Sequence, residues 1–103
     1  MDYISEAEHK ELIDILDELI KTISLLRNRN SDYILVQNEN EAREWMVFLK
    51  EHNDKEELRS LENEISDRFF YKYDVEIENS ELDNKRAYLI RKYIFTSSKL
   101  LQR

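Results

Sequence analysis

The sequence predicts an all-α fold, a small up-and-down bundle of about four helices. The 103 residues contain no Gly and no Pro, whereas an average domain of this size carries roughly seven and five. Glycine permits tight hairpins and proline stiffens turns, so a chain without either is most easily built from long helices. Capping patterns and apolar stripes at helical spacing then indicate where each helix lies.

The first helix has the clearest pattern. Ser5 and Glu8 match the capping box that starts a helix. An apolar stripe with intervals of three and four residues follows, made of Leu12, Leu16, Leu19, Ile23 and Leu26. The pattern ends at the polar cluster 28–30. We therefore expect one long helix between these two signals.

The second helix is expected to start near Asn38, with Glu41 three residues further on, and to end around 52–53. Before it, residues 33–36 read Tyr-Ile-Leu-Val and favour β-structure, so we leave open a short strand or a loop closing the bundle. The apolar residues of this helix are Ala42, Trp45, Met46, Val47, Phe48 and Leu49. They surround most of it, which is typical of a central helix or of one that meets a partner.

Asp54 with Glu57 predicts the start of a third helix. Its stripe consists of Leu58, Leu61, Ile65 and Phe69. Residues 69–77 fit both helical spacing and the alternation of a strand. We prefer the helix, because a lone hairpin of 69–77 with 33–36 would be marginally stable.

The fourth helix is expected to start after Ser80, with Asp83 three residues on. Its core stripe is Ala87, Ile90, Ile94 and Leu101. The opposite side carries Tyr88, Arg91, Lys92, Phe95 and Lys99. Aromatic and basic side chains turned outward suit a protein-binding hot spot; the alternative is a sandwiched helix whose aromatic rings are buried. No linker or repeat is visible, so we expect one domain over residues 1–103.

The formal net charge is −7, and it is unevenly distributed. Residues 81–103 hold six cations and two acids, a net of +4, which leaves −11 on the first 80 residues. An acidic body repels nucleic acid and anionic membranes. We therefore expect a protein partner with a basic patch rather than nucleic acid, and no membrane contact.

The missing residue types also narrow the chemistry. Without Gly or Cys, the chain has no glycine-rich phosphate loop, no cysteine-based zinc site and no cysteine nucleophile. The absence of cysteine fits a reducing compartment, and neither a secretory signal nor a run of roughly 20 apolar residues is present. We expect a cytoplasmic protein that is not an enzyme and needs no cofactor.

One acidic pattern supports an alternative. Glu41-x-x-Glu44 and Glu64-x-x-Asp67 lie on successive predicted helices, and acids at i and i+3 share a helix face. Facing pairs of this kind bind Mg²⁺, which can activate water. Over residues 41–67 the pattern resembles the all-α, MazG-like nucleotide pyrophosphatases, which implies a Mg²⁺-dependent pyrophosphatase. Solvated helix surfaces explain the same acids more simply.

The favoured hypothesis is a small acidic protein that acts by binding another protein, as an inhibitor, immunity-type or regulatory factor. Many Asn, Ile, Lys and Glu residues indicate an AT-rich coding region, such as that of a low-GC bacterium, its phages or its mobile elements. The candidate contact residues are Trp45, Phe48, Tyr88, Arg91, Lys92, Phe95 and Lys99. A third hypothesis is a structural homo-oligomer in which Val47 and Phe48 are buried against a second copy.

Overall fold

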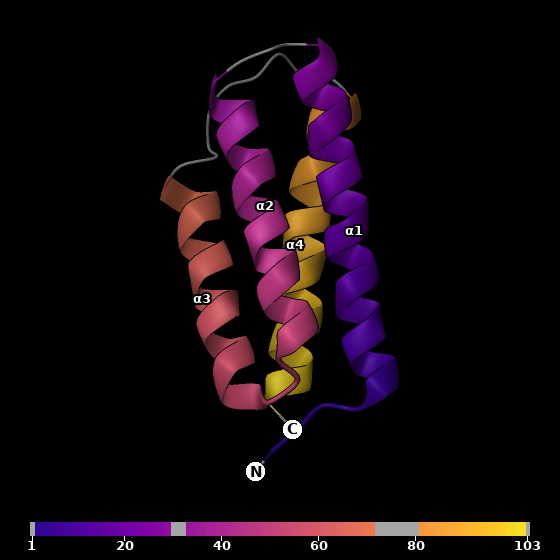
Figure 1. Cartoon of the computed structure of the whole chain (residues 1–103), viewed down its shortest axis with the longest axis vertical. Helices are drawn as coiled ribbons and strands as arrows, with labels where there is room; N and C mark the ends of the chain where they lie inside the picture. The colour runs from indigo at the N-terminus through magenta and orange to yellow at the C-terminus, as the bar shows by residue number, and fades with distance from the viewer. Residues whose placement is uncertain (1, 30–32, 72–80, 103) are drawn as a thin grey trace.

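The computed structural model describes residues 2–29, 33–71 and 81–102. Four helices make up the fold: α1 (Glu6–Arg29), α2 (Tyr33–Glu51), α3 (Lys55–Tyr71) and α4 (Glu81–Leu101). They run alternately up and down along one axis (Figure 1). The predicted all-α, up-and-down bundle of four helices is confirmed.

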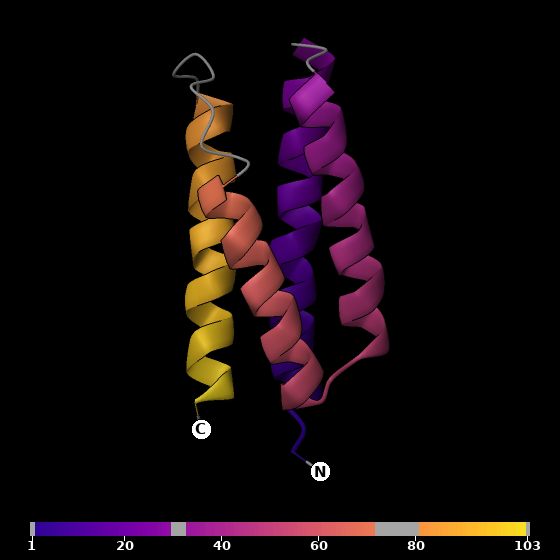
Figure 2. The same ribbon diagram turned by 90° about the vertical axis from the view of Figure 1, so that its left-hand side faces the viewer.

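The four helices are not packed equally. α1 packs closely on both α2 and α4, α4 also packs on α3, and α2 and α3 are the least closely packed of the four adjacent pairs. Figure 2 shows the reason, because α3 leans away from α2 and toward α4. The bundle measures 43 Å along its axis and 20 Å across. In the described part of the chain, no helix combines the length and the apolar character needed to cross a bilayer.

The core is formed by the apolar stripes of all four helices. The stripe predicted for α1 is buried over its whole length, from Leu12 to Leu26. The other helices contribute Leu35, Ala42, Trp45, Met46, Leu49, Leu58, Leu61, Ile65, Leu89, Ile90, Tyr93, Leu100 and Leu101. Full burial of one Leu or Ile side chain stabilises the fold by roughly 1.5–3 kcal/mol. This shared core is what holds the helices together.

The predicted caps of α1 and α3 are present. The Ser5 amide donates to Glu8 Oε1 at 2.9 Å, and the Glu8 amide donates back to Ser5 Oγ at 3.1 Å. At α3, the Glu57 amide donates to Asp54 Oδ2 at 3.2 Å. These bonds satisfy amide groups that have no partner within the first turn of a helix. The starts of α1 and α3 are therefore determined by residues within their own first turns.

The segment before α1 is bonded to the turn between α2 and α3. The Ile4 amide donates to the Asn53 carbonyl at 3.0 Å, and the Lys55 amide donates to the Asp2 carbonyl at 2.8 Å. Tyr3 and Asp54 form an isolated antiparallel bridge. No strand occurs in the described ranges; this bridge is the nearest approach to one.

The expectation for residues 33–36 is wrong, because α2 begins at Tyr33 and not near Asn38. Leu35, Asn38 and Ala42 lie on one buried face of that helix. The Asn38 side chain donates to the Ile34 carbonyl at 2.8 Å, within the helix itself. Burial of this face outweighs the β-propensity of the segment.

Residues 69–77, which fitted both a helix and a strand, are described by the structure only as far as residue 71. Residues 69–71 belong to α3, so the preferred prediction of a helix is confirmed for them. Residues 72–77 and the predicted Ser80 cap lie outside the described residues.

Buried polar side chains connect α2 to its neighbours near the start of that helix. Arg86 of α4 is only 4% exposed. Its Nη1 donates to Asn38 Oδ1 at 2.9 Å, and its Nη2 donates to Asp83 Oδ1 at 2.9 Å. On the other side, Arg27 Nε of α1 donates to Glu39 Oε2 at 2.8 Å. These bonds fix the neighbours of α2 at this end of the bundle.

Candidate protein-binding surface

The outward side of α4 is exposed to solvent. Tyr88 is 59% exposed and Phe95 is 62% exposed, and Arg91, Lys92 and Lys99 are exposed beside them. The opposite side of the helix buries Leu89, Ile90, Tyr93 and Leu100. The outward orientation of these five predicted contact residues is confirmed, and the alternative of a sandwiched helix with buried aromatic rings is wrong.

Each exposed aromatic ring on α4 contacts the lysine that follows it by four residues. Lys99 Nζ lies 4.4 Å from the centroid of the Phe95 ring, and Lys92 Nζ lies 6.0 Å from that of Tyr88. Exposed contacts of this kind are worth about 0.5–1 kcal/mol. With Lys85, these residues form a line at intervals of three and four. We call this line, from Lys85 through Tyr88, Lys92 and Phe95 to Lys99, the α4 row.

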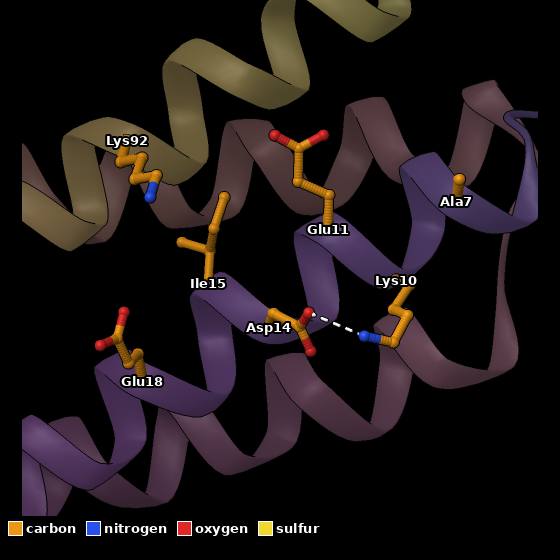
Figure 3. A pocket seen from close by; sticks show the side chains of 7 residues that line it. All are labelled: Ala7, Lys10, Glu11, Asp14, Ile15, Glu18 and Lys92. Atoms are coloured by element: carbon orange, nitrogen blue, oxygen red, sulfur yellow. Dashed lines mark hydrogen bonds and ion pairs between the residues drawn. The ribbon is translucent and has the colours of Figure 1, made fainter.

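An acidic line runs beside it on α1. It consists of Glu11, Asp14 and Glu18, with Ala7 one turn before them, and we call these four residues the α1 row. Two adjoining hollows separate the rows. One is lined by α1 row residues together with Lys10, Ile15 and Lys92 (Figure 3). The other is lined by Glu11 with Phe95, Thr96, Lys99 and Leu100. The seam between the helices is therefore a groove with one acidic and one basic, aromatic side.

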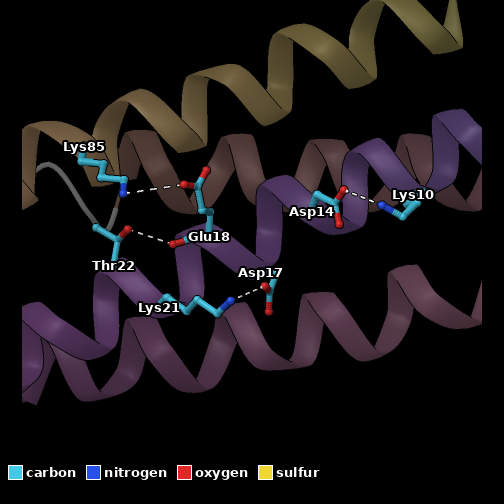
Figure 4. A network of polar contacts seen from close by, with 7 residues as sticks. All are labelled: Lys10, Asp14, Asp17, Glu18, Lys21, Thr22 and Lys85. Atoms are coloured by element: carbon cyan, nitrogen blue, oxygen red, sulfur yellow. Dashed lines mark hydrogen bonds and ion pairs between the residues drawn. The ribbon is translucent and has the colours of Figure 1, made fainter.

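Ion pairs occupy part of this surface (Figure 4). Lys85 Nζ lies 3.7 Å from Glu18 Oε1 and bridges the two rows. On α1, Lys10 pairs with Asp14 at 3.2 Å. These pairs are exposed, and such pairs add little to stability.

Other charges of the groove stay available. Glu11, Lys92 and Lys99 form no ion pair with any residue that the structure describes. Lys92 and Lys99 contact the aromatic faces described above. A partner could therefore pair with these three charges without first breaking an ion pair.

Comparisons of the chain with protein families, with curated proteins and with solved structures found no match.

Two further predicted contact residues lie elsewhere. Trp45 is 3% exposed and belongs to the core, so its prediction as a surface anchor is wrong. Phe48 is half-buried on α2, where its ring lies 4.3 Å from that of His52. Phe48 lines neither of the two hollows between α1 and α4, so it does not belong to the same surface as the α4 row.

The acidic pairs do not form the metal site that the alternative, Mg²⁺-dependent hypothesis required. Glu44, Glu64 and Asp67 are exposed, and Glu41 Oε2 lies 3.9 Å from Arg68 Nε. Over the described ranges, no three or more His, Cys, Asp or Glu side chains are grouped so that they could hold a metal ion. The two motifs lie on α2 and α3, the neighbouring helices that touch least. The Mg²⁺ hypothesis required carboxylates of the two motifs to lie close together, and these carboxylates do not.

The α1 side of the groove was not predicted. The intervals of the acidic α1 row were visible in the sequence, but acids on the outer side of a helix are common. Whether the α1 row forms one side of a groove depends on which helix lies next to α1. That neighbour is α4, the last helix of the chain, and the sequence pattern of α1 does not identify it.

Proposed function

We propose that the protein acts by binding another protein through the groove between the α1 row and the α4 row. The observation that carries this proposal is the exposure of Tyr88 and Phe95, at 59% and 62%, on one side of one helix. Aromatic residues and Arg are enriched at protein interfaces, and a few buried anchors supply most of the binding energy. Arg91 lies between the two rings in sequence, on the exposed side of α4.

The charges of the groove define the chemistry of the partner. A protein that covers both rows needs a basic patch opposite Glu11 and acidic groups opposite Lys92 and Lys99. The net charge of −7 would steer the basic patch toward the bundle and raise the association rate at low salt. We propose a cytoplasmic inhibitor, immunity-type or regulatory factor, of bacterial or phage origin, that blocks its partner sterically.

Affinity capture tests the proposal. The tagged wild-type protein is compared with the double variant Tyr88→Ala/Phe95→Ala in a lysate of the source organism. The matched control is Tyr33→Ala, which removes an aromatic ring that is 77% exposed on α2. We expect the wild type and the control to capture one protein in near-stoichiometric amount. Loss of two anchor rings should weaken capture on the order of a hundredfold, since each hot-spot residue contributes about 1–2 kcal/mol.

A second measurement uses the captured protein after purification. Its association rate with the wild type should fall as ionic strength rises, because salt screens electrostatic steering. If the double variant binds as tightly as Tyr33→Ala, the groove is not the interface. Capture of no protein by any of the three baits would overturn the proposal.

A further inference from the structure

We propose that this groove also pairs with a second copy of the same chain, in a two-fold arrangement that lays α1 of each copy along α4 of the other. This inference rests on the proposed function, because the same α1 and α4 rows make the contact. It goes beyond that proposal by naming a second occupant of the groove, a copy of the chain itself, with its orientation and its register.

The first support is that the surface is complementary to itself in charge. Residues 5–20 contain six acids and one lysine, a net of −5. Residues 84–102 present four exposed cations and no acid, because the fifth cation, Arg86, is buried and bonded to Asp83. These two segments belong to α1 and α4, which pack side by side (Figure 1). One copy therefore presents both an acidic and a basic, aromatic strip of similar size.

The second support is that symmetry brings opposite charges together. In a two-fold interface the same surface of both copies is used. An axis parallel to the helices places α1 of one copy over α4 of the other, at the same height along the bundle. An axis perpendicular to the helices would instead place α1 over α1, acid against acid. The charge pattern selects the first arrangement, in which the facing helices are antiparallel.

The third support is the register. Within one copy, Glu18 lies at the height of Lys85, since their charged atoms are 3.7 Å apart. Glu11 lines one hollow with Lys92 (Figure 3), and it lines the other with Phe95. The parallel axis keeps these heights, so Glu11 of each copy faces Lys92 and Phe95 of the other. Residues in both rows are spaced by three and four positions. Side chains with this spacing can interlock between two facing helices, whether parallel or antiparallel.

The contact between the two copies is small. Residues 85–99 extend about 21 Å at 1.5 Å per residue, on a face 20 Å wide. The flat area is therefore on the order of 400 Å² per copy, half of the roughly 800 Å² that a standard interface buries on each partner. We expect weak pairing that depends on concentration and on salt.

Sedimentation equilibrium over a wide concentration range at low salt tests the pair. The average mass of the wild type should rise toward twice that of one chain, and added salt should lower it. Lys92→Glu alone and Glu11→Lys alone should each lose at least about tenfold in association, since each places like charges opposite one another twice per pair.

A one-to-one mixture of these two variants should associate again. In a mixed pair, one of the two contacts keeps the native Glu11 opposite the native Lys92. The other contact holds the same two charges exchanged, so an acid faces a base in both. Recovery in the mixture therefore reports the register itself and not a general effect of charge.

Matched controls carry the same changes in charge on other helices. Lys50→Glu on α2 and Glu64→Lys on α3 alter exposed positions away from the groove, and both should associate like the wild type. The inference is overturned if the wild type stays monomeric at every concentration, or if the mixture is as monomeric as its components. Either result leaves the proposed function to be judged separately, by the effect of Tyr88→Ala/Phe95→Ala on capture of a different protein.

Discussion

Glu39 shows how one buried carboxylate connects two helices. Its side chain is 8% exposed, and it accepts hydrogen bonds from Arg27 of α1, with Arg43 at 3.5 Å on its own helix. Burial by itself raises the pKa of the Glu39 carboxyl. The bonds from Arg27 and Ser24 and the charges of Arg27 and Arg43 outweigh that effect and hold the pKa below its usual range.

This balance predicts a pH-dependent stability. Because the folded pKa of Glu39 lies below its unfolded value of about 4.3, its stabilisation is complete above that value. It is lost as the pH falls through the folded pKa. At neutral pH, Glu39→Gln should lower the free energy of unfolding by about 1 kcal/mol, a modest amount because Arg27 is partly open to solvent.

Urea unfolding at a series of pH values measures the effect. The difference between wild type and Glu39→Gln should shrink as the pH falls below about 4. Glu44→Gln, at an exposed position of the same helix, should show little difference at any pH. A gap for Glu39→Gln that stays constant into the acid range would contradict the assignment.

At the scale of the helix, the cap of α1 gives a direct test of local encoding. Ser5→Ala removes the side-chain oxygen that accepts from the Glu8 amide at 3.1 Å. The free energy of unfolding should fall by about 1 kcal/mol, the usual effect of losing an N-cap. Ser60→Ala on α3, at an exposed position inside a helix, should be neutral or slightly stabilising. Thermal unfolding followed by circular dichroism separates the two; equal melting temperatures would mean that the cap contributes nothing.

Helix starts and buried faces could be predicted from the sequence where they depend on residues close together in the chain. The caps at Ser5 and Asp54 and the regular stripe of α1 are confirmed, because each depends only on residues a few positions apart. The start of α2 was missed for an opposite reason. Its buried face includes Asn38 and Glu39, which look like surface residues until Arg86 and Arg27 are seen to bond them. An apolar pattern interrupted by polar residues concealed the first turns of this helix.

At the scale of the whole molecule, half of the candidate surface could be predicted. The outward side of α4 was predicted from helical geometry, although Ala87 and Ile94 of the predicted core stripe are only half-buried and Leu89, Tyr93 and Leu100 are buried with Ile90 and Leu101. Trp45 was misassigned since α2 has apolar residues on most sides, and periodicity does not tell which of them meets the core. The acidic pairs do not form a metal site because of how the helices pack. α3 leans toward α4, so the carboxylates of the two motifs on α2 and α3 are not grouped together.

The lean of α3 also determines where the native bundle should open first. The start of this helix is held by the bond from the Lys55 amide to Asp2 and by the bond from Arg59 Nη2 to the Leu101 carbonyl at 2.7 Å. Farther along, Ile65 is buried in the core, and Arg68 forms a 3.9 Å ion pair with Glu41 of α2. Regions with fewer packed neighbours open at a lower free-energy cost.

Amide hydrogen exchange should therefore show graded protection along α3. We expect residues 64–68 to exchange faster than residues 58–62, and both to exchange faster than the middle of α1, which is packed on two sides. Uniform protection across all four helices would mean that the bundle opens only as a whole. Graded protection would mean that α3 peels from its far end while α1, α2 and α4 stay folded as a three-helix unit, with the groove between α1 and α4 intact.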